Sequence, residues 1–163
     1  MSIVSDAFDL GKVGKTYNFR VRVKDNAGNV GPWSVVAKTI IPYDNDRFIY
    51  RRAGFNTTYK KATSRFYYGT LRYSARRGQE IVYKFTGKRV ILVSTKARNR
   101  GKAKIYVDGK YVKTIDAYSK KTKPRQIIYT KYWGKSKTHF VKIVNLGTPG
   151  RRVFDVDAIG IEH

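Results

Sequence analysis

Residues 96–119 read KARNRGKAKIYVDGKYVKTIDAYS, a basic loop followed by a predicted β-hairpin. Apolar and polar residues alternate from Ala103 to Asp108, as expected for a strand with one buried face. Asp108 and Gly109 form the pivot, and this dipeptide favours a two-residue type I′ turn, which needs positive φ at both positions. The stretch therefore predicts a β-protein. It also raises the question of whether the loop before the hairpin binds a ligand.

Composition favours strands and excludes several kinds of site. The chain of 163 residues contains 13 Tyr and no Cys, so it has neither a disulfide framework nor a thiolate metal site. No apolar run approaches the roughly 18 residues that a membrane-spanning helix needs, so we expect no membrane span. Residues 47–163 contain 29 Lys and Arg against 6 Asp and Glu. Such a charge attracts polyanions, although a surface adapted for solubility or heat is an alternative.

The N-terminal segment has a strand pattern and a family resemblance of its own. Residues 16–24 alternate apolar and polar side chains, which indicates a half-buried strand, and a second strand is expected over 35–41. The sequence of residues 17–34, YNFRVRVKDNAGNVGPWS, resembles the end of a fibronectin type III domain. This resemblance implies that the hydroxyl of Tyr17 bonds to the backbone at the strand entry. We expect residues 1–42 to be a partial fibronectin type III-like β segment of a larger multidomain parent.

Short strand patterns separated by turns fill the rest of the chain. Residues 43–46 are the predicted linker, and residues 47–163 carry strand patterns with turn residues every 8 to 12 positions, which favours a β-sandwich or a jelly roll. The predicted strands span 70–74, 79–86, 89–95, 103–107, 111–117, 125–132, 139–145 and 153–161. The fold class predicted for the whole chain is therefore all-β.

An ordered set of motifs supports that fold. The set comprises GTLRYS at 69–74, YKFTG at 83–87, NRGKAKIYVDG at 99–109, TIDAYS at 114–119 and VFDVDA at 153–158. This succession resembles the galactose-binding-like jelly-roll modules appended to secreted bacterial glycosidases and other surface proteins. The resemblance implies carbohydrate binding, an extracellular or cell-surface location and, in many such modules, a structural calcium ion. The present sequence departs from the family in its many Lys and Arg residues, which argues against a neutral sugar as ligand.

The few acids and histidines give little support to catalysis. His139 lies in a predicted strand, and His163 is terminal. Asp155 and Asp157 lie two residues apart on a strand and so share a face, where a glycosidase pair, a calcium-ligand pair and ion-pair partners of a buried arginine are the alternatives. We favour the ion pair, with Arg100 or Arg125 as the partner. We expect no enzyme activity and no cofactor other than that calcium ion.

The loop 98–101 is the best candidate for ligand binding. Arginine offers a planar fork that matches carboxylate, sulfate or phosphate, and asparagine can bridge sugar hydroxyls. The candidate ligand-binding residues are Arg98, Asn99, Arg100, Tyr118, Arg125 and Trp133. The alternatives are that 99–101 is a structural turn of the family and that the aromatic residues belong to the core.

A wider basic surface is expected around this loop. The predicted polyanion-binding residues are Arg76, Arg77, Lys88, Arg89, Lys120, Lys121 and Lys123. Residues 51–77 also interleave cations with aromatics, a pattern that suits nucleic acid and anionic polysaccharide equally. No nucleic-acid-binding motif is present. The sequence thus predicts a non-catalytic glycan-binding module that favours an anionic polysaccharide or wall polymer. A nucleic-acid or general polyanion binder and a structural spacer are the alternatives.

Overall fold

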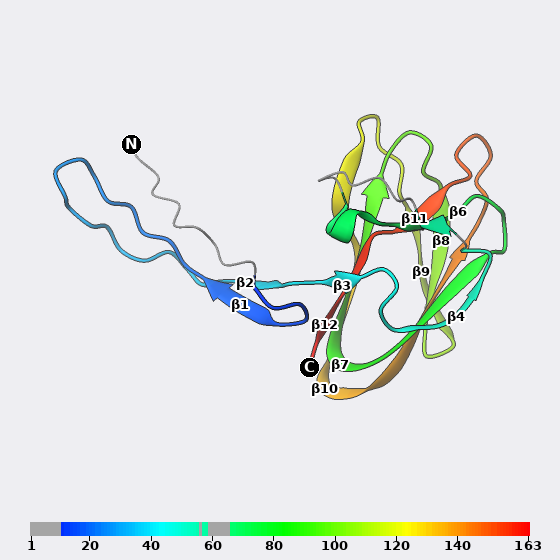
Figure 1. Cartoon of the computed structure of the whole chain (residues 1–163), viewed down its shortest axis with the longest axis horizontal. Coiled ribbons are helices and arrows are strands. Elements are labelled where there is room, and N and C mark those ends of the chain that lie inside the picture. The colour runs from blue at the N-terminus through cyan, green and yellow to red at the C-terminus, as the bar shows by residue number, and fades with distance from the viewer. Residues whose placement is uncertain (1–10, 56, 59–65) are drawn as a thin grey trace. The chain divides into compact units, whose positions relative to one another are not determined.

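The computed structural model describes residues 11–55, 57–58 and 66–163. Residues 59–65 of the cation- and aromatic-rich stretch lie outside this description. The chain divides into two compact units, Met1–Ile41 and Pro42–His163 (Figure 1). Among the described residues, no helix is long and apolar enough to cross a membrane.

The first unit contains one short antiparallel pair, β1 (Thr16–Phe19) and β2 (Ala37–Ile40). The hydroxyl of Tyr17 accepts a hydrogen bond of 2.7 Å from the backbone N–H of Lys12, as the sequence predicted. Beyond β1, the segments before and after the turn at 25–29 are joined by isolated backbone hydrogen bonds, such as that from Gly31 N–H to the Val23 carbonyl. The guanidinium groups of Arg20 and Arg22 lie 4.5 and 4.6 Å from the ring centre of Trp33. Two strands are too few to test the fibronectin type III resemblance, which stays a prediction.

The second unit is a β-sandwich built around two long strands, β7 (Glu80–Lys96) and β10 (Lys123–Asn145). They pair antiparallel along almost their whole length and bend together, so that each contributes to both layers (Figure 1). At the bend, a Cβ on Gly87 would approach the side chain of Ile161 to 2.6 Å, so glycine allows this close packing. The predicted strands 79–86 and 89–95 are therefore one continuous strand, as are 125–132 and 139–145.

The remaining strands complete the two layers. One layer has the order β4–β7–β10–β8–β9, and the other has the order β3–β12–β7–β10. A small third sheet has the order β11–β6–β5. The bounds are β3 Tyr43–Asp44, β4 Ile49–Ala53, β5 Thr57–Thr58, β6 Arg72–Ser74, β8 Lys102–Val107, β9 Lys110–Asp116, β11 Phe154–Val156 and β12 Ala158–Glu162, with a 3₁₀ turn η1 at Tyr67–Gly69. The prediction of an all-β sandwich is confirmed.

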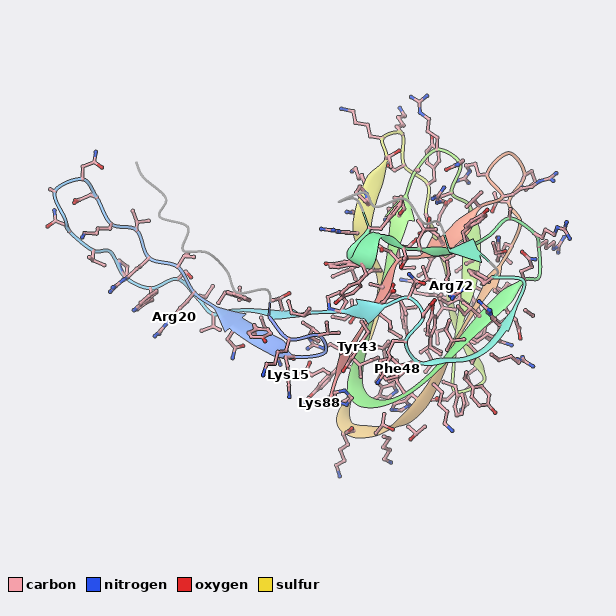
Figure 2. The ribbon with its side chains drawn as sticks, in the orientation of Figure 1. Lys15, Arg20, Tyr43, Phe48, Arg72 and Lys88 are labelled. Carbon is pink, nitrogen blue, oxygen red and sulfur yellow. The ribbon has the colours of Figure 1, made fainter. Side chains whose placement is uncertain are left out.

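The core lies between the inner faces of the two layers. Ile81 and Tyr83 from one half of β7 and Leu92 from the other half are fully buried in a single apolar cluster. Tyr43 and Phe48 close its side with an edge-to-face contact of 4.8 Å between ring centres (Figure 2). The alternation along β7 and β8 matches the predicted pattern, because residues facing the core are two apart on a strand.

The hairpin predicted from the sequence is present between β8 and β9. Asp108 has φ 50° and Gly109 has φ 80°, which are the positive values that a type I′ turn requires. Val107 pairs with Lys110 across the turn. The carboxylate of Asp108 also accepts hydrogen bonds of 2.8 Å from the backbone N–H of Phe140 and from Nδ1 of His139. The hairpin is thus fixed to β10 and has a structural role.

Candidate ligand-binding site

Several loops converge at the end of the sandwich opposite the bend of β7 and β10. The segments 75–79, 97–102, 116–122 and 146–153 are joined by backbone bonds, including bridges from Ala97 to Tyr118 and from Arg100 to Val153. We call these four segments the loop end. Figure 2 shows nitrogen-tipped side chains projecting from the upper loops of the second unit. The loop end holds most of the predicted ligand-binding residues. Their contacts show which side chains are bonded within the fold and which are exposed to a ligand.

Arg100 is part of the scaffold. Its Nε donates to Oδ2 of Asp155, which is completely buried, and the Arg100 side chain itself is only 14% exposed. The other oxygen of Asp155 accepts hydrogen bonds from the Ser94 hydroxyl at 2.9 Å and from the Thr95 N–H at 2.8 Å. The ion-pair interpretation of Asp155 is therefore confirmed, with Arg100 as the partner. Both carboxylate oxygens of Asp155 therefore have partners within the fold, and its role as a calcium ligand stays a prediction.

Arg98 and Asn99 are exposed. Nε of Arg98 donates 2.9 Å to the carbonyl of Lys120, which ties two loops together and leaves the other guanidinium nitrogens at the surface. Oδ1 of Asn99 accepts from Nη1 of Arg100 at 2.8 Å. These two residues can still offer donors to a ligand. The loop is thus partly a structural turn and partly an accessible surface.

Gly101 allows a close approach, but the partner is the protein's own backbone. A Cβ at this position would come within 2.0 Å of the carbonyl oxygen of Arg151 and 2.9 Å of the Thr148 hydroxyl. We expect Gly101→Ala to lower the free energy of unfolding by about 1–3 kcal/mol, because the loops must separate to admit the methyl group. Chemical denaturation would measure this change. Gly109→Ala is the contrasting variant: its Cβ meets nothing within 4 Å, so its cost comes from the positive φ alone.

Tyr118 lies on the loop end beside an arginine. The guanidinium of Arg151 lies 4.8 Å from its ring centre, and the ring is 45% exposed. Arg151 also forms two bonds to Asp116, of 2.8 and 3.2 Å. Burial acts to raise the pKa of Asp116, but the hydrogen bonds from Arg151 and from the Tyr118 N–H outweigh it and hold the pKa below its ordinary value. Tyr118 therefore presents an exposed ring edge on a fixed support.

Arg125 and Trp133 are not brought together with Arg98. Arg125 donates 3.1 Å to the carbonyl of Phe66 and lies over the ring of Tyr67, in the segment that carries η1. Trp133 lies at the bend of β10, at the opposite end from the loops, where it stacks on His139 with 3.8 Å between ring centres. It also packs against the core, which favours the aromatic-core alternative for this residue.

A pocket of about 310 Å³ lies at the loop end, and sequence reasoning found only part of it. It is lined by Ala75, Arg76, Arg77, Gly147, Pro149 and Arg152. Arg76 and Arg77 were predicted as polyanion-binding residues, whereas Arg152 was missed because 75 residues of sequence separate it from Arg77. Among the described residues, none of these three guanidinium groups has a carboxylate partner. Three arginine side chains without a described carboxylate partner therefore contribute to the lining of the pocket.

Buried polar contacts hold the pocket walls together. Asn145 is fully buried, and its Nδ2 donates to the carbonyl of Ser74 at 3.0 Å and to the carbonyl of Arg152 at 2.9 Å. Gly147 packs directly on Arg77, because a Cβ there would lie 2.8 Å from the Cβ of Arg77. The arginines thus project from a fixed backbone, which reduces the ordering cost of binding an anion.

The other predicted basic residues fall in two places. Lys120, Lys121 and Lys123 are exposed at or next to the loop end. Lys88 and Arg89 lie at the bend, where they approach the Glu162 carboxylate to 3.7 and 3.3 Å. Only the first group therefore lies at the same end of the second unit as the arginine pocket.

Asp157, the second predicted calcium ligand, has different surroundings from Asp155. Asp157 is fully buried, its Oδ1 accepts 2.9 Å from the Tyr67 N–H, and its Oδ2 has no hydrogen-bond partner among the described residues. Nearby, Nδ2 of the buried Asn45 contacts Oδ1 of Asp44 at 2.6 Å, the Thr70 hydroxyl at 2.7 Å and the Asp157 carbonyl at 3.3 Å. Oδ1 of Asn45 likewise has no partner within the described part of the chain. Burial raises the pKa of Asp157 to about 7, although the hydrogen bond from the Tyr67 N–H acts to lower it. The buried cluster thus gathers carboxylate, amide and hydroxyl oxygens, the atom type that a hard cation such as Ca²⁺ prefers.

The fold is similar to that of several solved carbohydrate-active proteins. A Paenibacillus xanthan lyase matches with a TM-score of 0.58 and 11% identity over 74% of this chain. A two-domain esterase active on acetylated mannans matches with a TM-score of 0.54 and 19% identity over 76% of this chain. A family 35 carbohydrate-binding module from an environmental isolate matches with a TM-score of 0.54 and 10% identity over 74% of this chain. No family model and no curated protein sequence matches.

The coverage differs between these neighbours. The match spans 13% of the lyase and 36% of the esterase, but 91% of the carbohydrate-binding module. The similarity at these identities shows a jelly-roll β-sandwich fold. We therefore infer the class of ligand from the side chains at the loop end.

Proposed function

We propose that this chain is a non-catalytic module that binds an anionic polysaccharide or wall polymer at its loop end. The observation that carries the proposal is the pocket lined by Arg76, Arg77 and Arg152, three arginines that have no carboxylate partner in the described part of the chain. Guanidinium groups match carboxylate and sulfate groups in a planar, bidentate geometry. A sugar that carries such a group can therefore place it in the pocket.

Binding would proceed in two stages. The excess of basic residues in the second unit draws the polymer by long-range attraction. The pocket then holds one anionic group, while Arg98, Asn99 and the exposed ring of Tyr118 offer donors and a stacking edge to adjoining sugar residues. The match to nearly the whole length of a carbohydrate-binding module supports a glycan as the polymer. The structural similarity to domains of the xanthan lyase and the two-domain esterase supports an extracellular or cell-surface location and a larger parent protein.

The triple variant Arg76→Gln, Arg77→Gln, Arg152→Gln tests the proposal. We expect its affinity for polygalacturonate or heparin to fall about 10- to 100-fold, because two to three charge-assisted hydrogen bonds are lost. Isothermal titration calorimetry at two salt concentrations would measure the change. The matched control is Lys15→Gln, Lys135→Gln, Lys137→Gln, which removes the same charge from exposed positions elsewhere. Equal losses in the two triple variants would overturn the assignment of the pocket.

The alternative functions give different results in the same experiment. A nucleic-acid or general polyanion binder would retain single-stranded DNA as tightly as the anionic glycans, with a steep loss of affinity in salt. A structural spacer would bind none of these polymers. A neutral mannan bound with little salt dependence would contradict the role given to charge.

We also propose that Asp44, Asn45, Thr70 and Asp157 hold a structural calcium ion. The buried oxygens of Asn45 and Asp157 that lack a partner among the described residues support this, because buried polar atoms without partners are costly. The ion would supply positive charge and oxygen coordination that join β3 to the segment before β12. Its role would be to stabilise the fold, at a position distinct from the arginine pocket.

A further inference from the structure

The outer face of one sandwich layer carries alternating lysine and aromatic side chains. The face is formed by β4, β7, β10, β8 and β9, whose other sides contribute core residues such as Ile81, Ile105 and Val141. Because side chains alternate along a strand, the residues between these core positions point outward. We call the outward set the lysine–aromatic face: it consists of Tyr50, Lys84, Lys104, Tyr106, Tyr111, Phe140 and Lys142.

Strand register places these residues next to one another. Lys84 pairs with Phe140, and Lys142 pairs with Tyr106, which in turn pairs with Tyr111. Five strands at a spacing of about 4.8 Å make a surface about 19 Å wide, enough for several sugar residues. Tyr50 is 62% exposed and Tyr111 is 55% exposed, so both edges of the face are open.

Aromatic rings hold the ammonium groups in place. Nζ of Lys84 lies 5.5 Å from the ring centre of Tyr50 and 5.6 Å from that of Phe140. Nζ of Lys142 lies 4.7 Å from the ring centre of Tyr106. A further contact of 5.9 Å joins Lys104 to Tyr111. Cation–π contacts restrict these flexible side chains, so less conformational entropy is lost when each ammonium meets an anion.

The charge of the face is largely uncompensated. Glu80, at one end, approaches Lys142 to 3.8 Å and also pairs with Arg51. Within the described part of the chain, Lys84 and Lys104 have no carboxylate partner. The face therefore combines ammonium groups held over aromatic rings with the exposed side chains of Tyr50 and Tyr111.

We propose that the lysine–aromatic face is a second binding surface for the anionic polysaccharide. This inference rests on the proposed function, because it assigns a further contact area to the same class of polymer. Repeating carboxylate or sulfate groups along one chain would pair with Lys84, Lys142 and Lys104 in turn. The tyrosine hydroxyls of the face would hydrogen-bond to sugar hydroxyls between these charges.

The arrangement favours a polysaccharide over a single-stranded nucleic acid. Nucleic-acid platforms stack bases on free aromatic faces. Here each of the three ammonium groups lies over a ring, as the distances above show, which hinders a base from stacking on that face. Hydrogen bonding and ion pairing remain available, and an anionic polysaccharide can use both.

The triple variant Lys84→Gln, Lys104→Gln, Lys142→Gln tests the inference, with the Lys15, Lys135 and Lys137 triple as the charge-matched control. We expect the affinity for long-chain heparin to fall about tenfold further than in the control, as the loss of three surface ion pairs implies. Binding of a heparin disaccharide, which can occupy only one site, should equal that of the control. Circular dichroism would verify that the variants are folded.

The outcomes separate this inference from the proposed function. If long-chain heparin binding falls equally in the lysine–aromatic variant and in the control, while the arginine-pocket variant is impaired, the second surface is wrong and the loop-end proposal stands. If the unaltered protein binds neither heparin nor polygalacturonate, both proposals are wrong. If single-stranded DNA competes with heparin at equal affinity and the face variant weakens both, the polysaccharide assignment of this face is overturned.

Discussion

Replacement of Arg100 by alanine is expected to lower the free energy of unfolding by about 3–5 kcal/mol. The change leaves the carboxylate of Asp155 in the interior with its hydrogen bonds from Ser94 and Thr95 but without its positive partner. An unpaired charge at this depth must either stay ionised at high cost or take up a proton. Urea denaturation monitored by tryptophan fluorescence would measure the loss.

Arg98→Ala is the matched control, since it removes an arginine two residues away on the same loop. Arg98 is exposed and bonds to the Lys120 carbonyl alone among the described contacts, so we expect a loss within about 1 kcal/mol. Similar stability losses for the two variants would show that the Arg100–Asp155 pair does not support the fold. A stable Arg100→Ala protein that fails to bind glycan would show that Arg100 takes part in glycan binding.

Raising the pH from 5 to 8 in calcium-free buffer is expected to destabilise the second unit by a few kcal/mol. Asp157 has a pKa of about 7 in the folded protein, whereas the ordinary value is 3.8. A carboxyl whose folded pKa is raised contributes stability below the unfolded pKa, and this stability is lost as pH rises through 7. Asp157→Asn should flatten the dependence, because the amide does not titrate. Thermal melts at a series of pH values would show both results.

Calcium provides the second readout of the same site. Millimolar calcium should raise the melting temperature of the unaltered protein at pH 8 and should have no effect on Asp157→Asn. Asp116→Asn serves as the control, because the pKa of Asp116 is lowered and its stabilising effect is lost only when pH falls. A pH-independent melting temperature between 5 and 8 would contradict the burial-raised pKa of Asp157. An unchanged melting temperature in calcium would contradict the proposed ion site.

The sequence by itself determined the fold class and the position of most strands, although it divided the long strands β7 and β10 into two strands each. Alternation of apolar residues specified the strands, and Asp108–Gly109 specified the hairpin, because positive φ at two successive positions is a local requirement. The excess of Lys and Arg in residues 47–163 is likewise visible without a structure. Even the Asp155 ion pair was predictable, because a buried carboxylate in a basic chain needs a cationic partner.

The tertiary structure alone decided which arginines are free and which charges share a surface. Arg98 and Arg100 look equivalent in the sequence, yet Arg100 is paired inside the fold while most of the Arg98 guanidinium remains at the surface. Arg152 joins Arg77 in one pocket because the buried Asn145 holds their loops together. The lysine–aromatic face likewise needs the register of five strands. Pairing between segments far apart in sequence depends on the packing of the whole sheet, so no local pattern encodes it.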